Sequence, residues 1–189
     1  MATKNPSAIM RSLGVVQEGD PILRQTARPF DLPAEADDAR RVAAELNSVI
    51  ERIEATHIFG KGVGIAAPQI GIDRAAAIVR APGAETVTLL NPKVVDQATK
   101  NAQEDEQNEG CLSFFDVRCM VPRARGIQVE HQDADGHRQL TIFEDGLARL
   151  VAHEVDHLIG VLCKDRMRPG VQPIPMTEYQ GVGQQWHYQ

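Results

Sequence analysis

The stretch Leu147–Gly160 places two histidines, His153 and His157, four residues apart. In an α-helix this spacing puts both imidazoles on one face, one turn apart, where they can bind the same divalent metal ion. Glu154 follows the first histidine and can reach a water molecule on that ion. The pattern H-E-x-x-H is typical of metal hydrolases, but it also occurs by chance in amphipathic helices that only pack. The stretch therefore predicts a helix, and other segments must decide whether that helix carries a metal.

The composition is that of an ordinary globular protein. The 189 residues are 42% hydrophobic and 24% charged, with a formal net charge of −6, which gives no electrostatic support for a nucleic-acid partner. No apolar run is long enough for a signal peptide or a membrane span. Three cysteines without a regular spacing argue against a disulfide scaffold. We therefore expect a cytoplasmic protein with no nucleic acid in its site and no membrane contact.

The hydrophobic pattern predicts one further helix and several strands. Apolar residues at helical spacing predict a helix over Asp37–Ala55. The predicted strands are Ala75–Arg80, Thr86–Leu90 (ending at Asn91-Pro92), Ile127–Gln132 and Arg138–Phe143. A turn at Asp133–Gly136 joins the last two strands into a β-hairpin. The helix with the two histidines is expected over Asp145–Ile159, with Gly160 as its stop signal.

The other segments are predicted as irregular. Gly19–Arg24 is expected to be a turn, and Gly60–Gly71 and residues 97–110 are expected to be loops. Residues 1–13 are expected to form a loose arm, and residues 171–189 an irregular or disordered tail. With no repeat or linker before residue 169, residues 1–170 are predicted to form a single domain. The fold class is α+β, with short antiparallel β-sheets packed around a central helix that carries the HExDH metal motif.

Two histidines leave a catalytic metal one protein ligand short, because such sites usually have three protein ligands and a water. The downstream candidates Asp165, Glu178 and His187 are poorly placed. Upstream, Cys111 stands beside a glycine in the irregular segment Glu109–Ser113, where the backbone can approach an ion closely. The alternative for Cys111 is a buried free cysteine. We choose Cys111 as the third ligand.

The glycine-rich stretch Gly62–Gln69 formally matches G-x-G-x-x-G/A, the dinucleotide fingerprint. That fingerprint needs a strand before it and a helix after it, whereas here a predicted helix precedes it and Pro68 disfavours a helical Ala67. The nucleotide interpretation is rejected. A segment in which substrate backbone lies against Gly64, with the Gln69 amide as a polar donor, suits the glycines better.

Together the three stretches resemble the peptide deformylase family. Its signatures G-x-G-(hydrophobic)-A-A-x-Q, E-G-C-(L)-S and Q-H-E-x-D-H correspond, in this order, to Gly62–Gln69, Glu109–Ser113 and Ala152–His157. The resemblance extends from about Asp20 to Arg166. Ile65 stands in place of the usual leucine. Ala152 stands in place of the usual glutamine, a change that affects hydrogen bonding around the ligands without removing one.

The resemblance implies a hydrolase that removes the formyl group from the N-terminal formylmethionine of newly made polypeptides and releases formate. By resemblance, Cys111, His153 and His157 hold one divalent metal ion, with iron(II) expected in the cell and zinc or nickel as alternatives. Glu154 is then the general base. The Gln69 side chain and the backbone N–H of Leu112 are the expected donors to the oxyanion.

Further roles follow from the resemblance. The implied substrate-binding residues are Val63, Gly64, Ile65, Glu109, Gly110, Arg118 and Leu150. Core packing is the alternative for the apolar residues of this set, which are assigned to a methionine pocket, and a plain surface residue is the alternative for Arg118. An ion pair between Asp156 and Arg123 is expected to orient the helix.

The implied partners are N-formylmethionyl nascent peptides, with the ribosome near its exit tunnel as a candidate. Two competing hypotheses remain. A zinc peptidase would need a third ligand other than Cys111. A non-enzymatic family member would only bind peptides or ribosomes, although Gln69, Cys111, Glu154 and both histidines are present.

Overall fold

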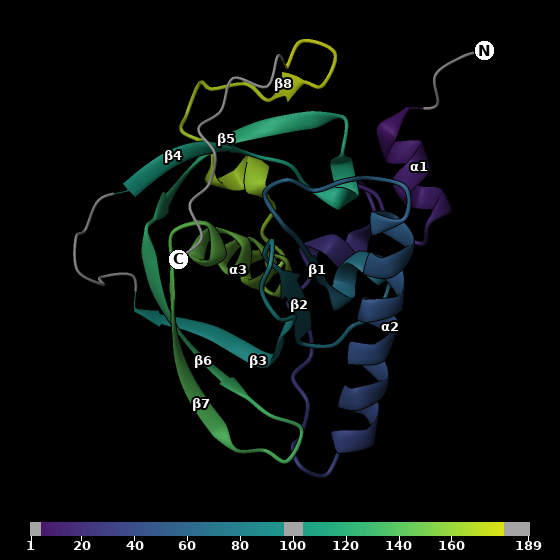
Figure 1. Cartoon of the computed structure of the whole chain (residues 1–189), viewed down its shortest axis with the longest axis vertical. Helices are drawn as coiled ribbons and strands as arrows, with labels where there is room; N and C mark the ends of the chain where they lie inside the picture. The colour runs from purple at the N-terminus through teal and green to yellow at the C-terminus, as the bar shows by residue number, and fades with distance from the viewer. Residues whose placement is uncertain (1–4, 97–103, 180–189) are drawn as a thin grey trace.

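The helix that carries both histidines, α3 (Asp145–Leu158), runs through the middle of the molecule (Figure 1). In this computed structural model, residues 5–96 and 104–179 are described. The helix contacts strands of both β-sheets, and its buried side chains include Val151 and Val155. The predicted α+β class, with antiparallel sheets around a central motif helix, is therefore confirmed.

The larger sheet has five antiparallel strands in the order β1-β2-β3-β6-β7. These strands are β1 (Val63–Ala66), β2 (Ala76–Arg80), β3 (Val87–Asp96), β6 (Gly126–Gln132) and β7 (Arg138–Glu144). The β6–β7 pair confirms the predicted hairpin, with Ile127 opposite Phe143. None of the helices in the described part of the chain is long and apolar enough to cross a membrane.

The smaller sheet has three strands in the order β4-β5-β8. They are β4 (Glu104–Glu109), β5 (Val117–Ala124) and β8 (Ile174–Pro175). The register pairs Glu109 at the end of β4 with Cys119 of β5. This pairing fixes the position at which the chain enters the segment with Cys111.

The predicted helix over Asp37–Ala55 is confirmed as α2 (Ala36–Glu54). Its buried face contains Val42, Leu46, Val49, Ile50 and Ile53, and burying such a side chain contributes roughly 1.5–3 kcal/mol relative to exposure. This face packs against β1 and β2, whereas α3 also contacts both strands. Strand β1 therefore lies between the two helices and is buried along its whole length.

In the described part of the chain, the smaller helices are α1 (Pro6–Ser12) and four 3-10 helices. The 3-10 helices are η1 (Pro21–Arg24), η2 (Ala67–Ile70), η3 (Leu112–Phe114) and η4 (Cys163–Arg166). The prediction of a loose arm was wrong for residues 6–12, which form α1. The Asn5 side chain caps the N-terminus of this helix, because it accepts hydrogen bonds from the backbone N–H groups of Ser7 and Ala8. Residues 1–4 lie outside the described residues.

Three other predictions need correction. The segment Gly60–Gly71 is not simply a loop, because it contains β1 and η2. Strand β3 does not end at Asn91-Pro92 but continues to Asp96, with a register shift between Leu90 and Lys93 that accommodates the proline. Residues 104–109 form β4 instead of a loop. Residues 97–103 lie outside the described residues.

The C-terminal segment also departs from the expected irregular tail where it is described. Ile174 and Pro175 form β8, opposite Arg118 and Val117 of β5. This short pairing brings Tyr179 to the pocket described below. The prediction for residues 180–189 lies outside the described residues.

Candidate active site

Three candidate metal ligands lie together in the interior. One ligand atom from each of Cys111, His153 and His157 lies within 4.8 Å of the others, and all three residues are buried. The Sγ atom of Cys111 is 3.3 Å from Nε2 of His157. Both histidines come from one face of α3, whereas Cys111 comes from the segment between β4 and η3. The grouping thus joins residues that are more than 40 positions apart in the sequence.

Hydrogen bonding orients His153, and burial favours the neutral form of His157. The Nδ1 atom of His153 is 3.0 Å from Oε2 of Glu109, and donation from this nitrogen leaves Nε2 free to bind an ion. Burial lowers the pKa of His157 well below its ordinary value, and the neighbouring His153 lowers it further. A neutral imidazole is the form that binds metal.

Glu109 is the centre of a buried ionic network. It accepts hydrogen bonds from Nε of Arg123 at 2.6 Å and from Nη1 of Arg149 at 2.7 Å, in addition to its contact with His153. Burial raises the pKa of Glu109, but the charge of Arg123 and the hydrogen bonds from His153 and Arg123 outweigh it and hold this pKa well below its usual value. The carboxylate therefore stays ionised.

The predicted ion pair between Arg123 and Asp156 is confirmed, with 2.9 Å between Nη1 and Oδ2. Asp156 also binds Arg166, at 2.6 Å. The sequence reasoning missed Arg149 and Arg166. Arg149 could have been found, because it lies four residues before His153 and so shares its helical face.

Glu154 lies against the backbone of β1. Its side chain is buried, and its Oε2 atom has no hydrogen-bond partner among the described residues. A Cβ atom on Gly64 would lie 2.5 Å from Oε1 of Glu154, so only glycine leaves room for this carboxylate. Burial raises the pKa of Glu154 to about 7, against the opposing charges of His153 and Arg123. A carboxyl group with such a pKa can exchange protons near neutral pH.

The Gln69 amide is held in a defined orientation. Its Oε1 accepts the backbone N–H of Ala66 at 2.9 Å, and its Nε2 points toward Ser113 Oγ at 3.3 Å and Cys111 Sγ at 3.7 Å. The amide N–H group therefore faces the candidate metal ligands. Leu112 directly follows Cys111 at the start of η3 and also lines the pocket.

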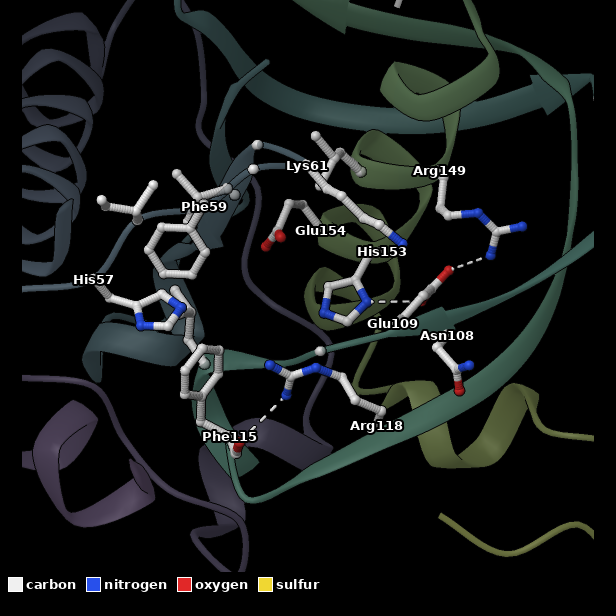
Figure 2. A pocket seen from close by; sticks show the side chains of 18 of the residues that line it. His57, Phe59, Lys61, Asn108, Glu109, Phe115, Arg118, Arg149, His153 and Glu154 are labelled. Carbon is white, nitrogen blue, oxygen red and sulfur yellow. Dashed lines mark hydrogen bonds and ion pairs between the residues drawn. The ribbon is translucent and has the colours of Figure 1, made fainter. Parts of the chain in front are cut away.

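A pocket opens over these groups (Figure 2). Most of the residues predicted to bind substrate line it, namely Val63, Gly64, Glu109, Gly110, Arg118 and Leu150. Ile65 was wrongly placed in this set, because it is fully buried in the core with Ile50 and Ile78.

The sequence reasoning missed several other lining residues: His57, Ile58, Phe59, Lys61, Phe115, Arg149 and Tyr179. The rings of His57 and Phe115 are 5.1 Å apart, and the guanidinium of Arg118 lies 4.8 Å from the centre of the Phe115 ring. No local motif marks these residues, which reach the pocket from four separate segments of the chain.

A buried Cys/His/His group beside a glutamate, on the central helix of an antiparallel α+β fold, defines a metal-dependent hydrolase of the H-E-x-x-H class. The model of the polypeptide deformylase family matches residues 12–172, and the chain belongs to this family.

Similar proteins and solved structures support the same family assignment. Peptide deformylase 2 of Nostoc is 35% identical over 177 residues, which cover 89% of this chain and 93% of the relative. The peptide deformylase of Thermotoga petrophila is 36% identical over 153 residues, covering 80% and 84%. The class I type b peptide deformylase of Acinetobacter baumannii, solved with Met-Ala-Ser bound, has 30% identity and a TM-score of 0.70 over 81% of this chain and 96% of that one. The chain is thus a hydrolase that removes the N-formyl group from the formylmethionine of newly synthesised polypeptides.

Proposed function

We propose that Cys111, His153 and His157 hold the catalytic metal of this deformylase. The observation that carries the proposal is the convergence of their three ligand atoms within 4.8 Å, with His153 oriented by Glu109. A thiolate and two imidazoles suit a divalent first-row metal and leave one coordination position open. We propose iron(II) as the metal in the cell, with zinc or nickel as substitutes. The bound ion supplies Lewis-acid activation of water at neutral pH.

Glu154 is the proposed general base. It takes the proton of the attacking water and passes it to the nitrogen of the leaving amine. Its burial and its pKa of about 7 support this role, because the carboxyl group can both accept and release a proton near neutral pH. Gly64 contributes by leaving the space that the carboxylate occupies.

Gln69 and Leu112 are the proposed donors to the oxyanion that forms when the formyl carbon is attacked. The Gln69 oxygen is already bound to Ala66, so its N–H group is the part that faces the site. This orientation costs no rearrangement during the reaction. Losing one donor of this kind lowers the rate by roughly 10²–10³.

The pocket is the proposed binding site of the peptide. In this proposal, the backbone of the substrate peptide lies against Gly64 and Gly110. The methionine side chain of the peptide contacts Val63 and Leu150, and both of these residues line the pocket. The Met-Ala-Ser complex of the Acinetobacter relative supports a peptide at this site. Glu109 belongs to the pocket wall but acts as a positioning residue through His153, since its oxygens are already bound to arginines.

Membership of the deformylase family also supports a proposal for where the enzyme acts in the cell. The enzyme acts in the cytoplasm on nascent peptides, near the exit tunnel of the ribosome. The match of the family model to residues 12–172 supports one catalytic domain that ends close to residue 170.

The test is deformylation of formyl-Met-Ala-Ser by anaerobically purified protein, with the metal quantified in the same sample. Turnover should follow the metal content. The Glu154→Ala variant should keep the metal and lose turnover, whereas Glu85→Ala, at an exposed position, should retain both. Bound metal without turnover of any formyl peptide would refute the assignment and favour the peptidase or binding hypotheses. Metal retention in Cys111→Ser would remove Cys111 from the ligand set.

A further inference from the structure

Strand β7 forms one edge of the five-stranded sheet. It pairs with β6 from Arg138, opposite Gln132, to Glu144, opposite Gly126, and no other strand in the described part of the chain pairs with it. Figure 1 shows β7 on the outside of the molecule, beyond β6. Alternate residues of an edge strand direct their backbone N–H and C=O groups away from the sheet, so β7 can accept one further strand.

Exposed apolar side chains lie on the outward face of β7. Successive side chains of a strand point to opposite faces, so Arg138, Leu140, Ile142 and Glu144 share one face. Leu140 is 60% exposed and Ile142 is 53% exposed, whereas Phe143 on the opposite face is buried in the core. The strand contains no proline or lysine, and its register with β6 has no shift. Such an edge favours pairing with another strand, because proline, lysine and bulges are the features that prevent it.

The sequence of β7 is complementary to itself when two copies run antiparallel. With a two-fold axis at Thr141, Leu140 of one copy faces Ile142 of the other, and Arg138 faces Glu144. Each of these pairs occurs twice, because a two-fold interface repeats every contact. Cross-strand apolar pairs and pairs of opposite charge are both stabilising. Moving the axis by one residue would instead place Arg138 opposite Ile142, or Leu140 opposite Glu144, so the pattern selects a single register.

The charges at the two ends of the strand are available for this pairing. Glu144 is exposed, and within residues 5–96 and 104–179 no cation lies within ion-pair distance of it. The Arg138 side chain is 78% exposed and lies 3.9 Å from a carboxylate oxygen of Glu130 in β6. A pair this long and this exposed contributes little, so Arg138 can reach a carboxylate of a second copy.

We propose that β7 is the interface of a two-fold homodimer, in which the sheets of two copies join edge to edge. The occupant of the edge is a second copy of this chain, because the apolar and charged positions of β7 match their own reverse order. The four exposed apolar side chains of the two strands cover one another in the dimer. A seven-residue strand makes a small contact, so the dissociation constant should be on the order of 10–100 µM.

Sedimentation velocity of the full-length, metal-loaded protein tests the proposal. Between about 2 and 400 µM the wild type should pass from the mass of one chain to twice that mass. Backbone amides of residues 138–144 should exchange hydrogen about threefold more slowly at the high concentration, whereas those of α2 should not change. A wild type that remains monomeric at the highest concentration would overturn the proposal and leave the edge to a different occupant.

One pair of variants tests the apolar contact. Leu140→Lys should raise the dissociation constant by at least about tenfold, because it removes two apolar pairs and adds a charge to the edge. Val171→Lys is the matched control, since Val171 is an exposed apolar residue outside β7, and it should dimerise as the wild type does. A dimer that persists unchanged in Leu140→Lys would place the contact elsewhere and contradict the proposal.

Charge exchange tests the register. Arg138→Glu and Glu144→Arg should each dimerise more weakly than the wild type, because like charges then face each other. An equimolar mixture of the two variants should dimerise again, since every end pair of the mixed dimer joins opposite charges. The double variant Arg138→Glu/Glu144→Arg should also recover the dimer. Melting temperatures show that each variant is folded, which matters for Glu144 because it precedes α3. If neither the mixture nor the double variant recovers the dimer, the antiparallel register is wrong.

Discussion

Replacing Gly64 by alanine should disable the proposed general base without removing the metal. The added Cβ would lie 2.5 Å from Oε1 of Glu154 and 2.8 Å from its Cγ and Cδ. An ordinary contact begins at 3.4 Å, so the carboxylate must retreat by about 0.9 Å. A displacement of about 1 Å in a reacting group can cost roughly 10²-fold in rate, which corresponds to about 2.7 kcal/mol of transition-state stabilisation.

The assay is kcat/KM for formyl-Met-Ala-Ser amide, with metal content and melting temperature measured on each sample. Gly60→Ala is the matched control, because no atom lies within 4 Å of the Cβ that it would add. In a Glu154→Ala background, Gly64→Ala should have little further effect, since residues that act as a unit are not additive. A Gly64→Ala enzyme that keeps its metal and stays within threefold of wild-type activity would refute this reasoning.

Three further predictions concern the buried charges and the metal. Glu109→Gln removes the buried carboxylate that Arg123 and Arg149 share, so it should lower the free energy of unfolding by about 3 kcal/mol and weaken metal binding about 10–100-fold. Urea unfolding and chelator competition measure these changes, and unaltered metal affinity would contradict them.

In the metal-free protein, Glu154 keeps its proton up to about pH 7, whereas the unfolded chain loses it near 4.5. The folded state binds more protons between these values, so the unfolding free energy should fall as the pH rises through this window, by up to about 3 kcal/mol. Glu154→Gln should remove that fall in pH-dependent denaturation. Chelation should lower the melting temperature of the wild type and re-addition of iron(II) should restore it; a melting temperature insensitive to metal would count against the ligand set.

The elements that the sequence predicted are those with strong local signals. Helix α2 has a regular apolar face, and α3 has a metal motif at helical spacing together with a glycine after its end. Strand β6 alternates in polarity before a turn, and β7 returns beside it after the turn. In each case the residues that specify the element are close together in the chain.

The strands that escaped prediction depend on distant partners. Strand β1 consists of Val63-Gly-Ile-Ala66 and is buried on both faces between α2 and α3, so it has neither alternation nor a β-branched run. Strand β4 consists only of polar residues, Glu104–Glu109, and its place depends on pairing with β5. Nothing local distinguishes such segments from loops.

In the candidate site, too, the residues placed by local spacing could be predicted from the sequence, whereas those that depend on distant segments could not. His153, Glu154 and His157 are set by one helix, so their arrangement follows from spacing alone. The pocket wall is not local, because Lys61, Phe115 and Arg149 come from three segments. Ile65 was misplaced for the same reason, since sequence position alone does not reveal which side chains of a doubly buried strand reach a cavity.

The burial of α3 constrains how an enzyme of this kind can change. Eleven of its fourteen residues are buried, so most of its positions are already committed to packing, to ion pairs or to the proposed reaction. Ile58, by contrast, is 91% exposed at the pocket, and Lys61 precedes β1 in the same segment. Evolution or design can therefore alter substrate preference at the mouth while the hydrolytic centre stays fixed. An inhibitor whose affinity depends on the mouth should meet resistance substitutions sooner than one anchored to the helix.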